Sequence, residues 1–132
     1  MAPKINGVHH ICLKAKGLEN FDKMVKFYTE ILGLPIVMKW GEGESIGMML
    51  GTGDCMLEIF ANATDYPQSS AIRHVALNVD DPDACIEAVR AAGYKVTIEP
   101  KDHTFNTNPP YHCRLAFCIG PVGEEVEFFK VK

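Results

Sequence analysis

Two histidines and two glutamates occupy matching positions in the two halves of the chain. His10 lies in VHHICLKA and His74 in IRHVALNV, while Glu58 lies in MLEIF and Glu127 in EVEFF. Imidazole nitrogens and carboxylate oxygens are donors that divalent transition metals accept in proteins. The pattern therefore indicates a metal site with two nitrogen and two oxygen ligands.

Strand alternation predicts that these four side chains share one kind of surface. Successive side chains of a strand point to opposite faces, so residues next to each histidine and glutamate, such as Ile11 and Val75, face the helices. If a pseudo-twofold arrangement brings the two halves together, two carboxylates meet, which is unfavourable without a cation. A divalent metal ion is the simplest cation for that position.

Each half shows the signals of a β-α-β-β-β unit. In the first, apolar residues at three- and four-residue steps from Phe21 to Leu32 predict an amphipathic helix with Asn20 as a candidate cap and Gly33 as its end. In the second, Asp81 before Pro82 predicts a capped helix start. The turn sequences GTGD and GPVGE each predict a link between the last two strands.

We therefore expect an α+β fold of two βαβββ modules within a single domain of residues 1–132. The first module spans about 5–62, a polar linker about 63–71, and the second module about 72–131. Residues 99–112 have no counterpart in the first half and predict a long irregular loop of the kind that often carries function. Tyr111 and His112, at its end, are expected to close over the site, whereas His9 and His103 are expected to be exposed.

The composition and net charge limit the classes of binding partner that we expect. With 132 residues, 47% of them hydrophobic, and a net charge of -4, the chain is expected to be an ordinary globular domain without a basic surface for nucleic acid or anionic membrane. No signal-like or membrane-spanning run is present in the sequence, so a cytoplasmic location is expected. Five scattered cysteines predict reduced thiols, with neither a disulfide framework nor a cysteine zinc site.

These motifs together resemble those of a known family. Five segments carry the resemblance, namely HHICL, KFYTEILGL, MLEIF, RHVALNVDD and GPVGEEVEFF. The pattern resembles the vicinal oxygen chelate superfamily, which has the glyoxalase/bleomycin resistance/dioxygenase fold, over about 5–131. The His, Glu, His, Glu set is most similar to the glyoxalase I, or lactoylglutathione lyase-like, branch. The resemblance implies a curved mixed sheet around a metal cavity, metal ligands His10, Glu58, His74 and Glu127, and a homodimer, and leaves open whether one chain or two complete each site.

The activity that the resemblance implies is that of a metal-dependent lyase or isomerase. A small molecule with vicinal oxygens would undergo proton transfer next to a carbonyl, through an enediolate held by Ni, Co, Zn, Mn or Fe. Glu127 or Glu58 would move the proton, and the family analogy favours Glu127. Lys14 and Asn62 align where glutathione-dependent relatives bind the tripeptide, but Lys14 replaces an arginine, which leaves glutathione use open.

Further residues are candidates for substrate binding. The full candidate set is Cys12, Lys14, Met48, Phe60, Asn62, Asn78, Tyr111, His112 and Arg114. Met48 and Phe60 could equally pack in the core, and Arg114 either lies along the surface or faces an anionic substrate group. Two other functions stay open: a metal isomerase or epimerase acting on a sugar or acyl thioester, and a small-molecule-binding resistance protein without turnover.

Overall fold

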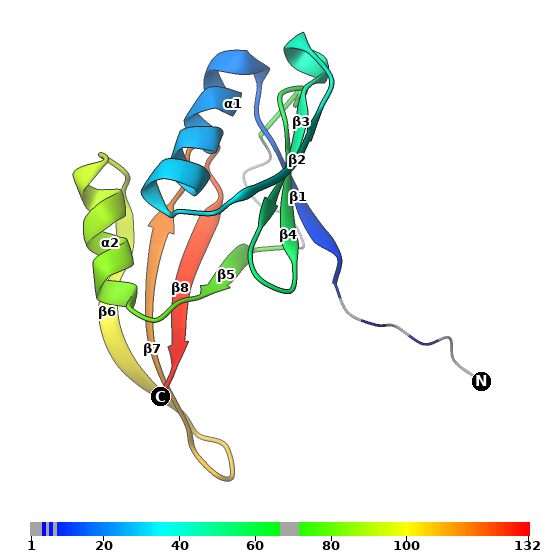
Figure 1. Ribbon diagram of the computed structural model, residues 1–132. Helices are drawn as coiled ribbons and strands as arrows, with labels where there is room; N and C mark the ends of the chain where they lie inside the picture. Colours follow the sequence, from blue (N-terminus) through cyan, green and yellow to red (C-terminus); the bar gives the residue numbers. More distant parts are fainter. Residues whose placement is uncertain (1–3, 5, 7, 67–71) are drawn as a thin grey trace.

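The computed structural model describes residues 4, 6, 8–66 and 72–132 (Figure 1). The first half contains β1 (His10–Lys14), α1 (Gly17–Val25), the π-helical turn η1 (Lys26–Ile31), β2 (Ile36–Trp40), the 3-10 turn η2 (Gly43–Ser45), β3 (Gly47–Gly51) and β4 (Met56–Phe60). The second half contains β5 (His74–Asn78), α2 (Pro82–Ala91), β6 (Val96–Phe105), β7 (Tyr111–Ile119) and β8 (Glu125–Val131).

Each half forms its own four-stranded mixed sheet. The strand orders are β1-β4-β3-β2 and β5-β8-β7-β6, with the first strand parallel to the last and the other pairs antiparallel. The predicted α+β class and the repeated β-α-β-β-β order are therefore confirmed. The module and linker bounds stay predictions, and residues 5, 7 and 67–71 of that division lie outside the described part of the chain.

The helices form where the sequence predicts them, with one change at a cap. The Asp81 carboxylate accepts a hydrogen bond from the Ala84 backbone N–H at 3.1 Å, as a residue preceding a first-turn proline should. Asn20 does not cap α1, because the helix begins at Gly17 and the Asn20 side chain donates to the Lys16 carbonyl within it. After η1, Gly33 turns the chain with a φ of 77°, a conformation that favours glycine.

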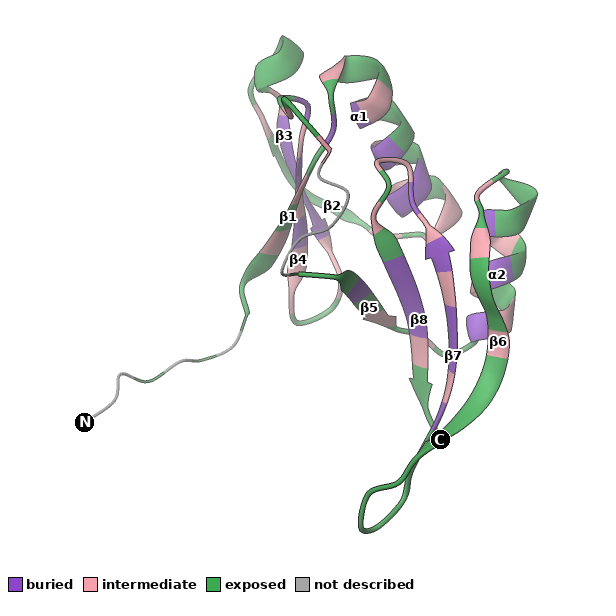
Figure 2. Cartoon of the chain, turned by 180° about the vertical axis from the view of Figure 1, so that it is seen from behind, coloured by how far each residue is buried: buried purple, intermediate pink, exposed green. Residues whose placement is uncertain are grey.

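The core lies between the helices and the sheet faces that they cover (Figure 2). Phe27 and Tyr28 of η1 lie at its centre with rings 4.8 Å apart, and Phe128 is fully buried in the second sheet. The Tyr28 hydroxyl donates to the Glu124 carboxylate at 2.8 Å and so joins the two halves of the chain. Burial raises the pKa of Glu124, because a carboxylate loses hydration there. No helix among the described residues is long and apolar enough to cross a membrane.

The predicted loop over residues 99–112 is wrong. β6 continues to Phe105 and β7 begins at Tyr111, and these two residues pair with each other at the end of a long hairpin. The hairpin projects at the bottom of Figure 1 and is largely exposed in Figure 2. The sequence of this segment is too polar to be recognised as strands. Two strands that extend beyond a sheet pair through their backbones and need no continuous apolar face.

Candidate metal centre in two halves

The first His–Glu pair lies on the sheet of the first half. His10 Nε2 is 3.5 Å from Glu58 Oε1, and the other ring nitrogen of His10, Nδ1, lies 2.9 Å from His9 Nδ1. His9 is exposed, as predicted. Its contact with His10 was not predicted. A group bonded to the second nitrogen fixes the ring and leaves the first nitrogen for a ligand.

The second pair lies on the sheet of the second half. His74 Nε2 is 3.2 Å from Glu127 Oε1, and Glu127 is only 8% exposed. Burial raises the pKa of Glu127, while the neighbouring His74 acts in the opposite direction. A carboxylate that is so poorly hydrated gains from a nearby cation.

The two pairs are built in the same register. In each sheet the glutamate lies directly opposite the residue two positions after the histidine, Cys12 facing Glu58 and Ala76 facing Glu127. The alternate residues turn to the other face, where Leu57 belongs to the core. The predicted placement of both pairs on the faces away from the helices follows from this register.

One chain does not unite the pairs. In the part of the chain that the structure describes, no group of three or more His, Cys, Asp or Glu side chains lies close enough together to hold a metal ion. Each pair supplies one imidazole and one carboxylate, and a zinc-like ion takes about four ligands. The donor chemistry of the four residues thus fits a divalent ion as two half-sites, each open on one side.

Three candidate substrate residues lie on the same face as the first pair. The Lys14 ammonium is 5.5 Å from the centre of the Phe60 ring, close enough for a cation–π contact. Burial, followed by the negative charge of the Glu58 carboxylate, raises the pKa of the Cys12 thiol.

Two candidates lie on the wrong face. Met48 is 4% exposed and packs in the core, which was one of its two expected positions, while Met49, whose backbone pairs with Glu58, shares the face of the first pair. Arg114 turns toward α2, where its Nε and Nη2 donate to both carboxylate oxygens of Asp83 at 2.6 and 2.8 Å, and its Nη1 donates to Asp102 at 3.2 Å. The structure therefore gives Arg114 a partner in its own chain and not a place beside the pairs.

The remaining candidates for substrate binding differ in where their side chains lie. Tyr111 shares the face of Glu127, whereas the adjacent His112 turns to the opposite face and bonds Thr104 at 2.9 Å, so the prediction that both cover the site is wrong for His112. Asn62 is exposed just after β4, where it bridges to Lys16, and Asn78 is exposed at the end of β5.

Several residues of the two open faces are absent from the predicted set. They are aromatic or apolar: Trp40, Met49, Phe105, Phe117 and Phe129. Trp40 lies 5.9 Å from Phe60, and Phe117 lies 5.3 Å from His74, measured between ring centres. Alternation within β8 places Phe129 beside Glu127, but the other positions depend on the register between strands.

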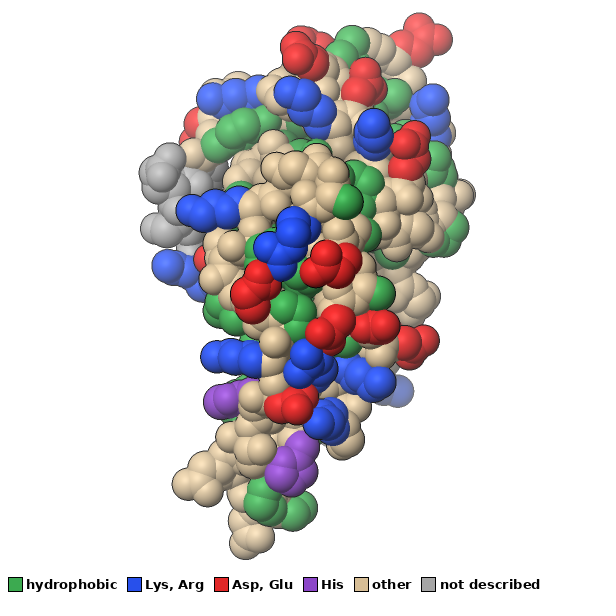
Figure 3. Space-filling view, turned by 90° about the vertical axis from the view of Figure 1, so that its left-hand side faces the viewer, with side chains coloured by type: hydrophobic (Ala, Val, Ile, Leu, Met, Phe, Trp, Pro, Cys, Tyr) green, Lys and Arg blue, Asp and Glu red, His purple; other side chains and the backbone are tan. Residues whose placement is uncertain are grey.

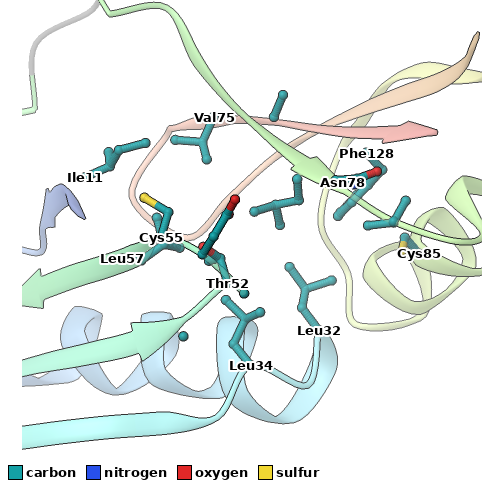
Figure 4. Close-up of a pocket in the computed structure, with 16 residues that line it drawn as sticks. Ile11, Leu32, Leu34, Thr52, Cys55, Leu57, Val75, Asn78, Cys85 and Phe128 are labelled. Atoms are coloured by element: carbon teal, nitrogen blue, oxygen red, sulfur yellow. The ribbon is translucent and has the colours of Figure 1, made fainter. Parts of the chain in front are cut away.

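A cavity of about 470 Å³ is lined by residues of both halves (Figure 4). It is lined by apolar side chains such as Ile11, Leu34, Leu57 and Val75. None of the four paired His and Glu residues lines it. The cavity is therefore separate from the half-sites.

The fold defines a class of protein. The chain is an α+β domain of two repeated units, each with a four-stranded mixed sheet. The family model of the Glyoxalase/Bleomycin resistance protein/Dioxygenase superfamily matches residues 7–109, and the chain belongs to this superfamily.

Individual relatives agree with that assignment. The chain is 30% identical to a probable lactoylglutathione lyase of Vibrio cholerae, over 94% of this chain and 92% of the relative, and 29% identical to the lactoylglutathione lyase of Haemophilus influenzae, over 86% of each. Among solved structures, a glyoxalase family protein from Enterococcus faecalis superposes with a TM-score of 0.68 at 20% identity, covering 94% of this chain and 97% of that one. TnmS3, an antibiotic binding protein from Streptomyces, superposes with 0.69 at 18% identity, covering 98% and 100%. These structural likenesses concern the fold.

Proposed function

We propose that this chain is a metal-dependent lyase or isomerase of the glyoxalase I type. Its reaction would be proton transfer next to the carbonyl of a small molecule that carries two adjacent oxygens. The observation that carries the proposal is the His–Glu pair repeated in one register in both sheets. The relatives named lactoylglutathione lyase support the same chemistry.

The residues that would hold the ion are His10, Glu58, His74 and Glu127. A divalent ion held there would bind adjacent substrate oxygens and stabilise the negative charge that develops when a proton is lost. We further propose that a second copy of the chain supplies the pair that each half-site lacks, which makes the working form a homodimer. We also propose that the protein is located in the cytoplasm.

Glu127 is our candidate for the group that moves the proton. Its carboxylate is 3.2 Å from the exposed His74 ring, and Phe117 and Phe129 lie on the same face of the sheet. A carboxylate with little hydration is a stronger base than one in water, and it can take a proton from a C–H and return it without leaving the site. Glu58, on the more open first sheet, is the alternative.

The test begins with metal content and turnover. Protein purified without chelator is analysed for bound metal and then assayed with methylglyoxal and glutathione after loading with Ni, Co, Zn, Mn or Fe. We expect bound metal and S-lactoylglutathione. Glu127→Gln should lower turnover at least about a hundredfold, the usual contribution of a general base. The exposed Glu30→Gln is the control, and near-normal turnover of Glu127→Gln would refute the role of Glu127.

A second candidate function is a metal isomerase or epimerase with another carbonyl substrate. Lys14 favours it, because a lysine ammonium does not reproduce the two-pronged carboxylate contact of the arginine found in similar glutathione-dependent proteins. Bound metal without S-lactoylglutathione would favour this candidate. Protein without metal would instead favour a small-molecule-binding function.

A further inference from the structure

The cavity of about 470 Å³ is lined by the strands that carry the two His–Glu pairs, but by other side chains of those strands. Four of its lining residues are each the chain neighbour of one paired histidine or glutamate: Ile11, Leu57, Val75 and Phe128. Because successive side chains of a strand point to opposite faces, these four point away from the face of the paired residues. An occupant of the cavity would therefore contact β1, β4, β5 and β8 without touching either pair.

The lining of the cavity is apolar but incompletely covered. Leu32, Leu34 and Val79 pack against the core and are only partly buried, whereas Phe128 is fully buried. Figure 4 shows Leu32 and Leu34 of the first half and Val75 of the second half around one space. Apolar side chains that enclose a space without filling it lack contacts that an apolar occupant would supply.

Backbone hydrogen bonds hold the walls of the cavity in place. The Gly51 N–H donates to the Pro35 carbonyl at 2.9 Å, which ties the segment after η1 to the end of β3. In the second half, the Val79 N–H donates to the Phe129 carbonyl at 2.9 Å and fixes the end of β5. A site that is formed before its ligand arrives costs little ordering when it is filled.

Polar side chains line the cavity at the turn between β3 and β4 and at the end of β5, namely Thr52, Asp54 and Asn78. Figure 3 shows one face of the molecule, where side chains of both charges are interspersed. In the cavity, by contrast, Asp54 is the one charged side chain among the described residues that line it. Carboxylate and hydroxyl oxygens accept hydrogen bonds, and a carboxylate repels a second anion. These polar groups suit a ligand whose head donates a hydrogen bond.

We propose that this cavity binds a small saturated aliphatic molecule with a hydrogen-bond-donating head, such as a primary alcohol or amine. A cavity of about 150 Å³ lined by Leu, Ile and Phe holds benzene, so one about three times as large has room for a chain of about eight to ten carbons. Phe128 is the one aromatic ring among the described lining residues, and branched aliphatic side chains make up most of the rest, which favours a saturated chain. The inference does not rest on the proposed function, because none of the paired residues lines the cavity.

The first test varies the head of the ligand. 1-Octanol, octylamine and octanoate share a chain length, and their affinities for the purified protein are measured by calorimetry below their micelle concentrations. We expect the alcohol and the amine to bind and octanoate to bind about fivefold more weakly than octanol, the effect of one like charge near the surface. Asp54→Asn should abolish this difference, and Asp22→Asn, the same change at an exposed position of α1, should keep it. Equal affinities of octanol and octanoate for the wild type would overturn the proposed ligand class.

The second test locates the bound chain. Octanol should shift the amide NMR resonances of Thr52 and Val79 and raise the Tm, since a ligand that binds only the folded state stabilises it. Val79→Phe fills the cavity and should weaken octanol binding about tenfold or more. Val131→Phe makes the same change at a position that is 52% exposed and outside the lining, and it is the matched control. If Val79→Phe does not fold, Leu34→Phe fills the cavity from the first half.

Two results would overturn the site. One is an unchanged octanol affinity in a folded cavity-filling variant, which would mean that octanol binds elsewhere on the surface. The other is octanol that dissociates the protein to monomers in sedimentation, because a segment of a second copy would then be the occupant. Neither measurement uses metal or turnover, so failure of the proposed function leaves both tests intact.

Discussion

Mixing two inactive variants should restore metal sites if two chains share each site. His10→Ala disables the first half-site and His74→Ala disables the second, and each pair is a separate unit in the structure. In a mixed dimer, one site carries both substitutions and the other carries neither. Random reassociation of equal amounts yields half mixed dimers, each with one intact site of two, so about 25% of the wild-type sites return.

The assay is metal content and turnover after the two variants are unfolded together and refolded. The matched control mixes His10→Ala with Glu58→Ala, which damage the same half, so that every site keeps a fault. We expect recovery in the first mixture and none in the control. Recovery no greater than that of either parent would refute the shared site, because a site within one chain gains nothing from a partner.

Four further predictions concern stability. Met48→Ala should lower the free energy of unfolding by about 2–5 kcal/mol, the cost of truncating a buried methionine, and a loss below about 1 kcal/mol would contradict its core position. Gly120→Ala should cost about 1–3 kcal/mol in denaturant unfolding, since the new Cβ would lie 2.4 Å from a Glu124 oxygen. Burial raises the pKa of Glu124, so the folded protein holds this proton to higher pH than the unfolded chain does. The free energy of unfolding of the wild type should therefore fall relative to that of Glu124→Gln as pH rises through the raised pKa. A difference between the two proteins that stays constant with pH in urea titrations would argue against this. Arg114→Met removes the hydrogen bonds between β7 and Asp83 of α2, so it should lower the Tm while turnover stays normal. Loss of turnover would instead indicate that Arg114 binds substrate.

The repeat and the strand alternation were sufficient to predict the two pairs and the face that each occupies. Both signals are local, because alternation needs only the strand itself. They left Met48 undecided between the core and the site, because a hairpin's register depends on the residues in its turn, and one residue more or less exchanges Met48 with Met49. Arg114 failed for a different reason, since its partner Asp83 lies 31 residues earlier on another element.

The hairpin of β6 and β7 shows how composition misleads. Proline, asparagine and threonine between Glu99 and His112 are typical of loops, yet the strands pair as far as Phe105 and Tyr111. The informative signal was the alternation of His103 and Phe105 with polar neighbours. His103 and Phe105 lie on the face of the hairpin that carries Tyr111 and Glu127.

A shared ion would make metal binding and association of the chains one equilibrium. Each pair offers one imidazole and one carboxylate, too few ligands to hold an ion well alone, so a shared ion would bind two chains together better than it would bind either one. By linkage, whatever the ion contributes to the dimer, the dimer contributes equally to the affinity for the ion. The low exposure of Glu127 would act in the same direction, since its carboxylate is already partly removed from water and a nearby cation would offset that loss of hydration. Under the proposed function, the duplicated pairs would thus make the chemistry depend on a second copy of the chain.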